Sequence, residues 1–126
     1  MKTLTSIVLI GLMPLSYSLR GQEVDYVSST LWADVNDVEV VGNYAYCAFI
    51  NGLVVIDISA PDAPVFVSQL FLGSSPSIDV AGDFAYLADR DSGLAIVDVS
   101  DPANPALTGI CHTPGSTSDV FVVGNY

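Results

Sequence analysis

The stretch GLVVIDISAPDAP, residues 52–64, returns in closely similar form as GLAIVDVSDPANP, residues 93–105. Each copy has a glycine, a run rich in β-branched residues that ends in an aspartate, and two prolines three positions apart. Self-similarity at a fixed period of about 20–50 residues is the signature of a repeat architecture. The stretch therefore predicts a chain built from repeated units of about 40 residues.

Further landmarks extend the repeat beyond this stretch. DVEVVGNYAYCAF (37–49) matches SIDVAGDFAYLAD (77–89), and DVFVVGNY (119–126) starts the pattern a third time. The residues that recur in the same order are Gly42, Gly82 and Gly124, then Gly52 and Gly93, Asp57 and Asp98, and the proline pairs Pro61/Pro64 and Pro102/Pro105. We expect one unit over 37–76, a second over 77–118 and the start of a third over 119–126.

Each unit reads as four short strands. In the first unit, DVEVVG alternates and places Val38 and Val40 on one face, and the Gly-Asn and Asn-Gly pairs at 42–43 and 51–52 are hairpin signals. The run LVVIDIS that follows is typical of a strand buried on both faces. The prolines then interrupt the ladder before a fourth strand, VFVSQLFL. No sustained helical period is present after the N-terminal segment, so the sequence predicts an all-β fold.

Four strands in about 41 residues, repeated, describe a blade of a β-propeller. One such sheet has two apolar faces and can bury them only by stacking against neighbouring blades. A β-sandwich and a parallel β-solenoid remain as alternatives. A closed ring needs at least about four blades. We therefore expect an incomplete ring, the N-terminal piece of a longer protein, in which DYVSSTLW (25–32) is the outer strand that completes the last blade.

The repeated strand also resembles a known family. LVVID (53–57) and LAIVD (94–98) are similar to the core of the LVIVD repeat, and the wider frame matches over Val40–Pro64 and again over Val80–Pro105. The resemblance implies propeller-type repeats in secreted or surface proteins of bacteria, mostly without an assigned biochemical function.

The N-terminus predicts export. Residues 1–18 contain the basic Lys2, an apolar run from Ile7 to Leu15 and small residues at Ser16 and Ser18, which together describe a signal peptide cut before Leu19. The apolar run is short for a membrane span. A buried first strand and an uncleaved anchor are the alternatives. We expect a secreted, extracellular or cell-surface protein with no membrane insertion after cleavage, and a lead-in over 19–36.

The charge balance of the sequence disfavours negatively charged partners. The chain has 14 acidic residues and three basic ones, with a formal net charge of −11. Such a surface repels nucleic acid and anionic lipid. Its simplest role is to keep a strand-rich protein soluble and to block pairing between strand edges.

The two cysteines, Cys47 and Cys111, occupy different positions of the repeat. A disulfide between them is possible in an exported protein, but we expect two partly buried thiols. No CxxC or HExxH motif supports a zinc site.

Two sets of carboxylates are candidates for chemistry. Asp57 and Asp98 would suit a carboxylate ring, but their recurrence in each unit favours a role in bonding turn amides. Asp89 and Asp91, in DRDSG, faintly resemble a calcium loop. The further ligands of such a loop are missing, and a polar hairpin turn explains the pattern equally well.

The remaining candidates are single residues or aromatic positions. His112 follows Cys111, but neighbours on a strand point to opposite faces and do not easily share a proton. No serine lies in GxSxG. An aromatic residue recurs at two positions of the repeat, which predicts packing between blades or, alternatively, a stacking platform for a carbohydrate or aromatic ligand. These aromatic residues are Tyr44, Phe84 and Tyr126, and Tyr46 with Tyr86.

These observations favour a non-enzymatic, exported propeller module without a cofactor, whose partners are a protein or carbohydrate ligand and the remaining blades of the full-length chain. One alternative is a lactonase-like propeller enzyme with a central metal on other blades, for which Glu39 is the one candidate ligand here, since Asp79 and Phe121 are its counterparts. A passive spacer of a surface-anchored protein is the other alternative.

Overall fold

The computed structural model describes residues 18–19, 22–23 and 35–126. The chain divides into two compact units, 1–33 and 34–126. In the first, β1 (Ser18–Leu19) pairs with β2 (Gln22–Glu23) in antiparallel fashion, a pairing that the sequence did not predict. The predicted strand over 25–32 and almost all of the predicted signal peptide lie outside the described residues.

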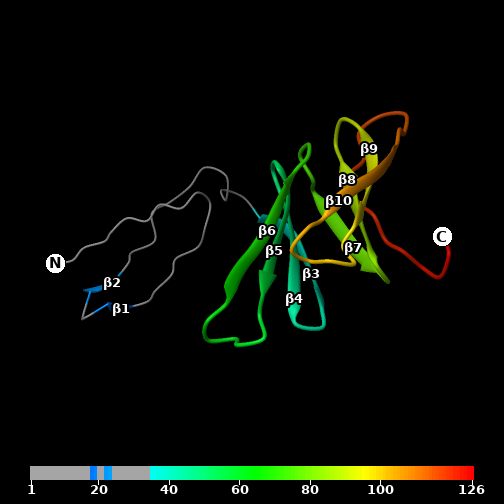
Figure 1. The fold of residues 1–126 in the computed structure, drawn as a ribbon. Helices are drawn as coiled ribbons and strands as arrows, with labels where there is room; N and C mark the ends of the chain where they lie inside the picture. The colour runs from blue at the N-terminus through cyan, green and yellow to red at the C-terminus, as the bar shows by residue number, and fades with distance from the viewer. Residues whose placement is uncertain (1–17, 20–21, 24–34) are drawn as a thin grey trace. The chain divides into compact units, whose positions relative to one another are not determined.

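The second unit contains two antiparallel four-stranded sheets (Figure 1). Within each sheet the strands follow one another in chain order, and residues 35–126 contain no helix. The first sheet consists of β3 (Val35–Val41), β4 (Tyr44–Phe49), β5 (Gly52–Asp57) and β6 (Val65–Phe71). The second sheet consists of β7 (Ser77–Ala81), β8 (Phe84–Asp89), β9 (Gly93–Asp98) and β10 (Ala106–Cys111). The all-β fold with propeller-type four-stranded blades is thereby confirmed.

The first turn of each blade is built in the same way. Gly42 and Gly82 both adopt φ 61°, a left-handed conformation that costs glycine little. The carbonyl of the next residue then accepts an amide from the end of the third strand. These bonds are Ile58 N to Asn43 O and Val99 N to Asp83 O, both 2.8 Å. The first glycine of each repeat therefore marks the turn between the first and second strands, and this turn is hydrogen-bonded to the residue that follows the third strand.

The proline landmark is also a turn. Ala63 N donates to Ala60 O at 2.8 Å, and Asn104 N donates to Asp101 O at 2.9 Å. Each bond closes a four-residue turn in which the first proline of the pair occupies the second position, where its fixed φ is favourable. The second proline directly precedes β6 or β10.

Gly52 and Gly93 allow the fourth strand to approach closely. Both have positive φ, 130° and 106°. A Cβ at Gly52 would fall on the carbonyl oxygen of Leu70, and one at Gly93 on the carbonyl oxygen of Cys111. Side chains are excluded at both positions by backbone on the neighbouring strand.

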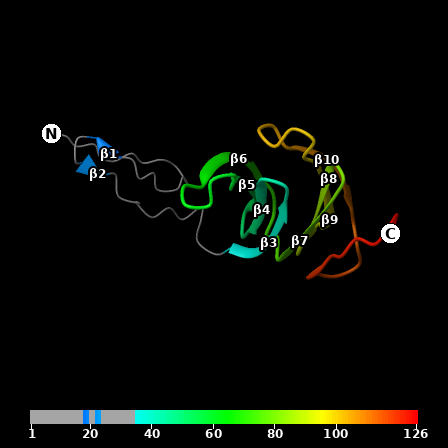
Figure 2. The same ribbon diagram turned by 90° about the horizontal axis from the view of Figure 1, so that it is seen from below.

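The core lies between the two sheets, where β7 packs against β3 and β4 (Figure 2). The first sheet contributes alternate residues of β4 and β5, and the second sheet contributes alternate residues of β7, β8 and β9. Full burial of a valine, leucine or isoleucine side chain stabilises the folded state by about 1.5–3 kcal/mol. The core residues are Tyr46, Ala48, Leu53, Val55, Ile78, Ala85, Leu87, Ala95, Val97 and Val99.

The face of β3 that carries Val38 and Val40 is not the buried one. Val38 and Val40 share a face of β3, as the alternation predicts, but they are 48% and 53% exposed. The residues of β3 that point toward the second sheet are instead the half-buried acids Asp37 and Glu39. The inner strand of this blade thus turns its carboxylates, not its valines, toward its neighbour.

The third strands also differ from each other. In β5, Leu53, Val54 and Val55 are fully buried, as expected of a strand covered on both faces. In β9 the burial alternates, with Ala95 and Val97 buried and the side chains between them half-buried. The uniform apolar run therefore does not mean uniform burial, because β9 has a packed sheet on one face and only residues 119–126 described on the other.

Residues 119–126, called here the third-repeat segment, lie on the side of the second sheet away from the first (Figure 2). They match the first strand of a unit in sequence but form no strand in the structure. Their local backbone bonds are those of a turn, between Val123 and Tyr126. A first strand needs its second strand as ladder partner, and no strand pairs with this segment within 35–126.

Candidate functional site

The inner strands of the two blades are joined through Asp37. Its Oδ1 accepts the backbone amide of Val38 at 2.9 Å, and its Oδ2 accepts that of Ile78 at 3.0 Å. Val38 and Ile78 occupy the same position in successive units. One carboxylate thus caps equivalent amides of two first strands, the strands at the edge of each sheet, where unpaired amides are otherwise open to other chains.

The second blade is joined to the third-repeat segment in a related way. Asp79 Oδ2 accepts the amide of Val122 at 2.6 Å. Asp119 Oδ1 accepts both the hydroxyl of Ser77, at 2.8 Å, and the amide of Val120, at 2.9 Å. Carboxylates that bond backbone amides are among the stronger hydrogen-bond acceptors. These acids were not singled out from the sequence, although their alternation along the first strand was the available signal.

Two further hydrogen bonds join segments that lie far apart in the chain. Ser68 Oγ, buried in β6, donates to the carbonyl of Pro102 at 2.6 Å, and Asn36 Nδ2 donates to the carbonyl of Ser75 at 2.9 Å. The proline turn of the second unit is thereby held against the outer strand of the first.

The recurring aspartates Asp57 and Asp98 bond the turns that follow them. Asp57 Oδ1 accepts the amide of Ser59 at 2.8 Å. Asp98 Oδ1 accepts both the amide and the hydroxyl of Ser100, at 2.9 and 2.6 Å. In both cases the bonds from serine hold the pKa of the carboxyl below its ordinary value. Both aspartates cap their turns, and no metal group includes them among the described residues.

Asp89 is buried, with 3% of its surface exposed. Its Oδ1 accepts the amides of Asp91 and Ser92, both at 3.1 Å, so the carboxylate closes the β8–β9 turn on itself. It also lies against Gly73, where an added Cβ would be 2.5 Å from Oδ2. The DRDSG pattern is thus a hairpin turn in which the Asp89 carboxylate accepts two backbone amides of the same turn. Asp91 is exposed.

The two cysteines are both free thiols. Cys47 is buried in β4, and burial raises the pKa of its thiol to about 11. Cys111 is exposed at the end of β10, so the expectation of two partly buried thiols is wrong for this residue. β10 is an edge strand of its sheet, which leaves Cys111 at its end open to solvent. His112, next along the chain, is exposed as well.

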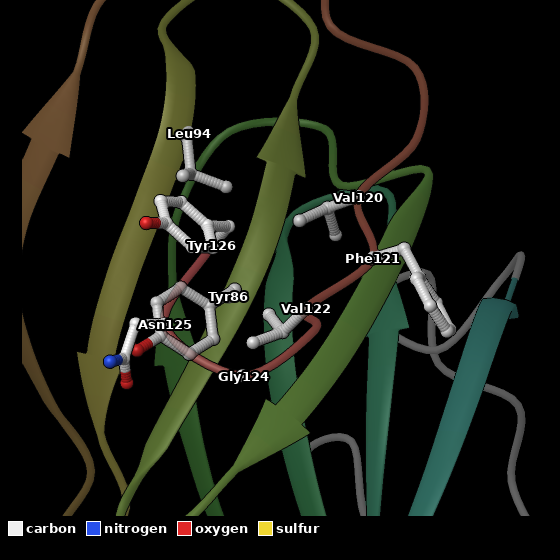
Figure 3. A pocket seen from close by; sticks show the side chains of 8 residues that line it. All are labelled: Tyr86, Leu94, Val120, Phe121, Val122, Gly124, Asn125 and Tyr126. Atoms are coloured by element: carbon white, nitrogen blue, oxygen red, sulfur yellow. The ribbon is translucent and has the colours of Figure 1, made fainter.

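A hollow of about 340 Å³ lies between the second sheet and the third-repeat segment (Figure 3). Tyr86 of β8 and Leu94 of β9 form one wall, and Tyr126 lies beside them, while Phe121 points away. Tyr46, the counterpart of Tyr86, is 5% exposed in the core between the blades. The recurring aromatic therefore packs between blades in the first unit and lines an open hollow in the second. The other lining residues are Val120, Val122, Gly124 and Asn125.

Three further observations concern metal ligands and membrane spans. Among residues 18–19, 22–23 and 35–126, no group of three or more His, Cys, Asp or Glu side chains is placed to hold a metal ion. Glu39, the candidate ligand of a metal-centred enzyme, is half-buried opposite Tyr46. In the same part of the chain, no helix has the length and apolar character that a membrane crossing requires.

Comparison with known proteins agrees with this geometry. The model of the LVIVD repeat matches residues 33–70 and 72–113, one match for each four-stranded sheet, and together the matches cover more than half of the chain. Neither the curated proteins nor the solved structures contain a match to the chain. Two family matches that coincide with two equivalent blades place this protein in the LVIVD repeat family.

Proposed function

We propose that this protein is a non-enzymatic, exported β-propeller module that binds a protein or glycan ligand at the cell surface. The observation that carries the proposal is the contrast between a constant frame and variable loops. The turns at Gly42 and Gly82 and at the two proline pairs have matching bonds in both units. The β4–β5 and β8–β9 turns do not match.

These two turns differ in length and in character. The first presents Ile50, which is 47% exposed, and the second is one residue longer and presents the exposed Arg90 and Asp91. Loops that vary on a rigid frame are where binding residues concentrate. An asymmetric pair of a nucleophile and a base would favour an enzyme instead, and the recurring carboxylates are occupied by turn amides.

Export is supported by the N-terminal pattern around Lys2 and Ile7–Leu15. The acidic composition supports a partner other than nucleic acid or an anionic lipid surface. Neither feature names the ligand.

The test is a binding screen of the full chain against arrays of peptides and of surface polysaccharides, beside turnover assays with hydrolase substrates. We expect a saturable ligand on one array and no turnover. The variant Arg90→Ser/Asp91→Ser should weaken binding, and Asp62→Ser, in the proline turn, is its control. Turnover above background would favour the enzyme. Unchanged binding by the loop variant would show that the ligand does not bind at the β8–β9 turn.

A further inference from the structure

We propose that the face of the second sheet lined by Tyr86 and Leu94 is a docking surface for the second- and third-strand hairpin of a further LVIVD unit. This inference is independent of the ligand proposed above. It concerns the hollow shown in Figure 3, for which a carbohydrate site is the other obvious interpretation.

The hollow is equivalent to a space that is filled between the first two units. Tyr86 and Leu94 match Tyr46 and Leu53 in the repeat. Tyr46 and Leu53 are 5% and 0% exposed because they pack in one core with residues of β8 and β9. The wall of the hollow is therefore the same surface that the first unit presents to the hairpin of the second.

The hydrogen bonds between units continue from the second unit to the third-repeat segment. Asp37 caps the amide of Ile78, and Asp79 caps the amide of Val122, one repeat further along. The third-repeat segment thus already lies beside β7 in the place of a first strand. Val120 and Val122, the counterparts of Ile78 and Val80, both line the hollow.

The occupant follows from what fills the equivalent place. On the face of β8 that meets the first sheet, Ala85 is followed two residues later by Leu87, and β9 contributes Ala95 and then Val97. A small residue followed by a larger apolar residue on each strand lets the strands pass close to the tyrosine and still fill the space beneath it. A hairpin with this pattern, paired with residues 119–124, is the partner that the surface fits.

A second copy of this chain is a poorer occupant in a head-to-tail arrangement. It would have to offer the other face of its first sheet, the face of Cys47 and Val54. Those side chains are already 6% and 0% exposed within one chain. The side chains at the centre of that face therefore offer almost no surface to a second copy, while Val38 and Val40 at its β3 edge are exposed.

The experiment extends the full chain after Tyr126 with a second copy of residues 85–111, which completes a third unit. Solvent paramagnetic relaxation of the Leu94 and Val122 methyl groups reports whether the hollow is covered. We expect relaxation at both residues to fall several-fold, while that of Leu107, exposed on β10, stays unchanged. The matched control carries Leu87→Asp in the added copy only, and should leave Leu94 as accessible as in the original chain.

A separate peptide with the sequence of residues 84–98 guards against an extension that does not fold. We expect it to bind the original chain saturably and to protect the same methyl groups, and the peptide with Leu87→Asp should not bind. If neither the extension nor the peptide protects Leu94 while both sheets stay folded, the proposal is wrong. It is also wrong if the original chain dimerises with Leu94 at the contact, as light scattering and the same relaxation measurement would show.

Discussion

Asp37 and Ile78 lie in different sheets, and the carboxylate of Asp37 accepts the backbone amide of Ile78 at 3.0 Å. The same carboxylate caps Val38, the residue equivalent to Ile78, in its own strand. One side chain thus joins two edge strands, and Ser77 stands at the equivalent position of the second unit. This bond is a specific link between the units, in addition to their apolar core.

Replacing Asp37 by alanine should destabilise the protein by about 1–3 kcal/mol, because it leaves the part-buried amide of Ile78 without an acceptor. Asp37→Asn, which keeps one acceptor oxygen, should cost less. Urea unfolding followed by circular dichroism measures both. The exposed Asp62 provides the control, as Asp62→Ala. Equal midpoints for Asp37→Ala and Asp62→Ala would show that the link contributes nothing.

Gly73→Ala should destabilise the fold by about 1–3 kcal/mol, since a side chain there forces apart well-packed groups. The added Cβ would lie 2.5 and 2.7 Å from the carboxylate oxygens of Asp89. That carboxylate is held by two amides of its own turn and has little freedom to move. Gly109→Ala is the matched control, because a Cβ there meets nothing within 4 Å. The thermal midpoints of the two variants should differ clearly, and a shared midpoint would mean that Asp89 gives way.

The apolar core should respond to truncation at its centre. Leu87→Ala removes a fully buried side chain from the cluster shared by both sheets and should cost about 2–5 kcal/mol. Leu107→Ala, on the outer strand and 43% exposed, should change stability by less than about 0.5 kcal/mol. Denaturant unfolding compares the two. Similar losses at both positions would contradict the assignment of the core to the space between the sheets.

Acid should weaken the turns that Asp57 and Asp98 cap. The folded pKa of each carboxyl lies below its unfolded value because of the bonds from Ser59 and Ser100. Their contribution to stability is therefore fully present above the unfolded pKa and is lost as the pH falls through the folded pKa. In Asp98→Asn, the capping oxygen stays but the titration disappears, so stability should depend less steeply on pH in the acidic range. Unfolding midpoints measured over that range, with Asp62→Asn as control, test this.

The two thiols should react at very different rates. Cys111 is exposed, whereas Cys47 is buried with its thiol pKa raised to about 11. Because the thiolate is the reactive form, a maleimide at neutral pH should label Cys111 fast and Cys47 only after unfolding. Mass spectrometry of the labelled peptides distinguishes them. Labelling of both residues at one rate in the folded protein would place Cys47 at the surface.

The repeat was readable from the sequence because each landmark has a local physical cause. Glycines at positive φ, prolines in turns and a β-branched third strand need no knowledge of distant residues. Burial on each face was not readable in the same way. LVVID and LAIVD are nearly the same pentapeptide, yet Leu53 and Val55 are fully buried while their counterparts Leu94 and Ile96 are half-buried. What lies on the second face of a strand is decided by another part of the chain.

The links between units were missed for the same reason. Asp37, Asp79 and Asp119 look like solubilising acids when they are read one at a time. Their hydrogen-bond donors in another unit lie about 40 residues away in the chain, and they are the amides of Ile78 and Val122 and the hydroxyl of Ser77. The turn bonds of Asp57 and Asp98 were easier to foresee, since donor and acceptor are two residues apart. Contacts between residues close in the sequence could therefore be predicted, whereas contacts between residues of different units could not.

We expect the two LVIVD units, as equivalent blades that share one core, to fold as one body. Native-state amide hydrogen exchange in increasing denaturant tests it most directly, with the amides of Val55 in β5 and Val97 in β9 as reporters. If the claim is right, both amides exchange through the same global opening, with one free energy and one denaturant dependence, and Leu87→Ala lowers both equally. If Val55 stays protected under conditions in which Val97 exchanges freely, the sheets are independent and the shared core does not exist.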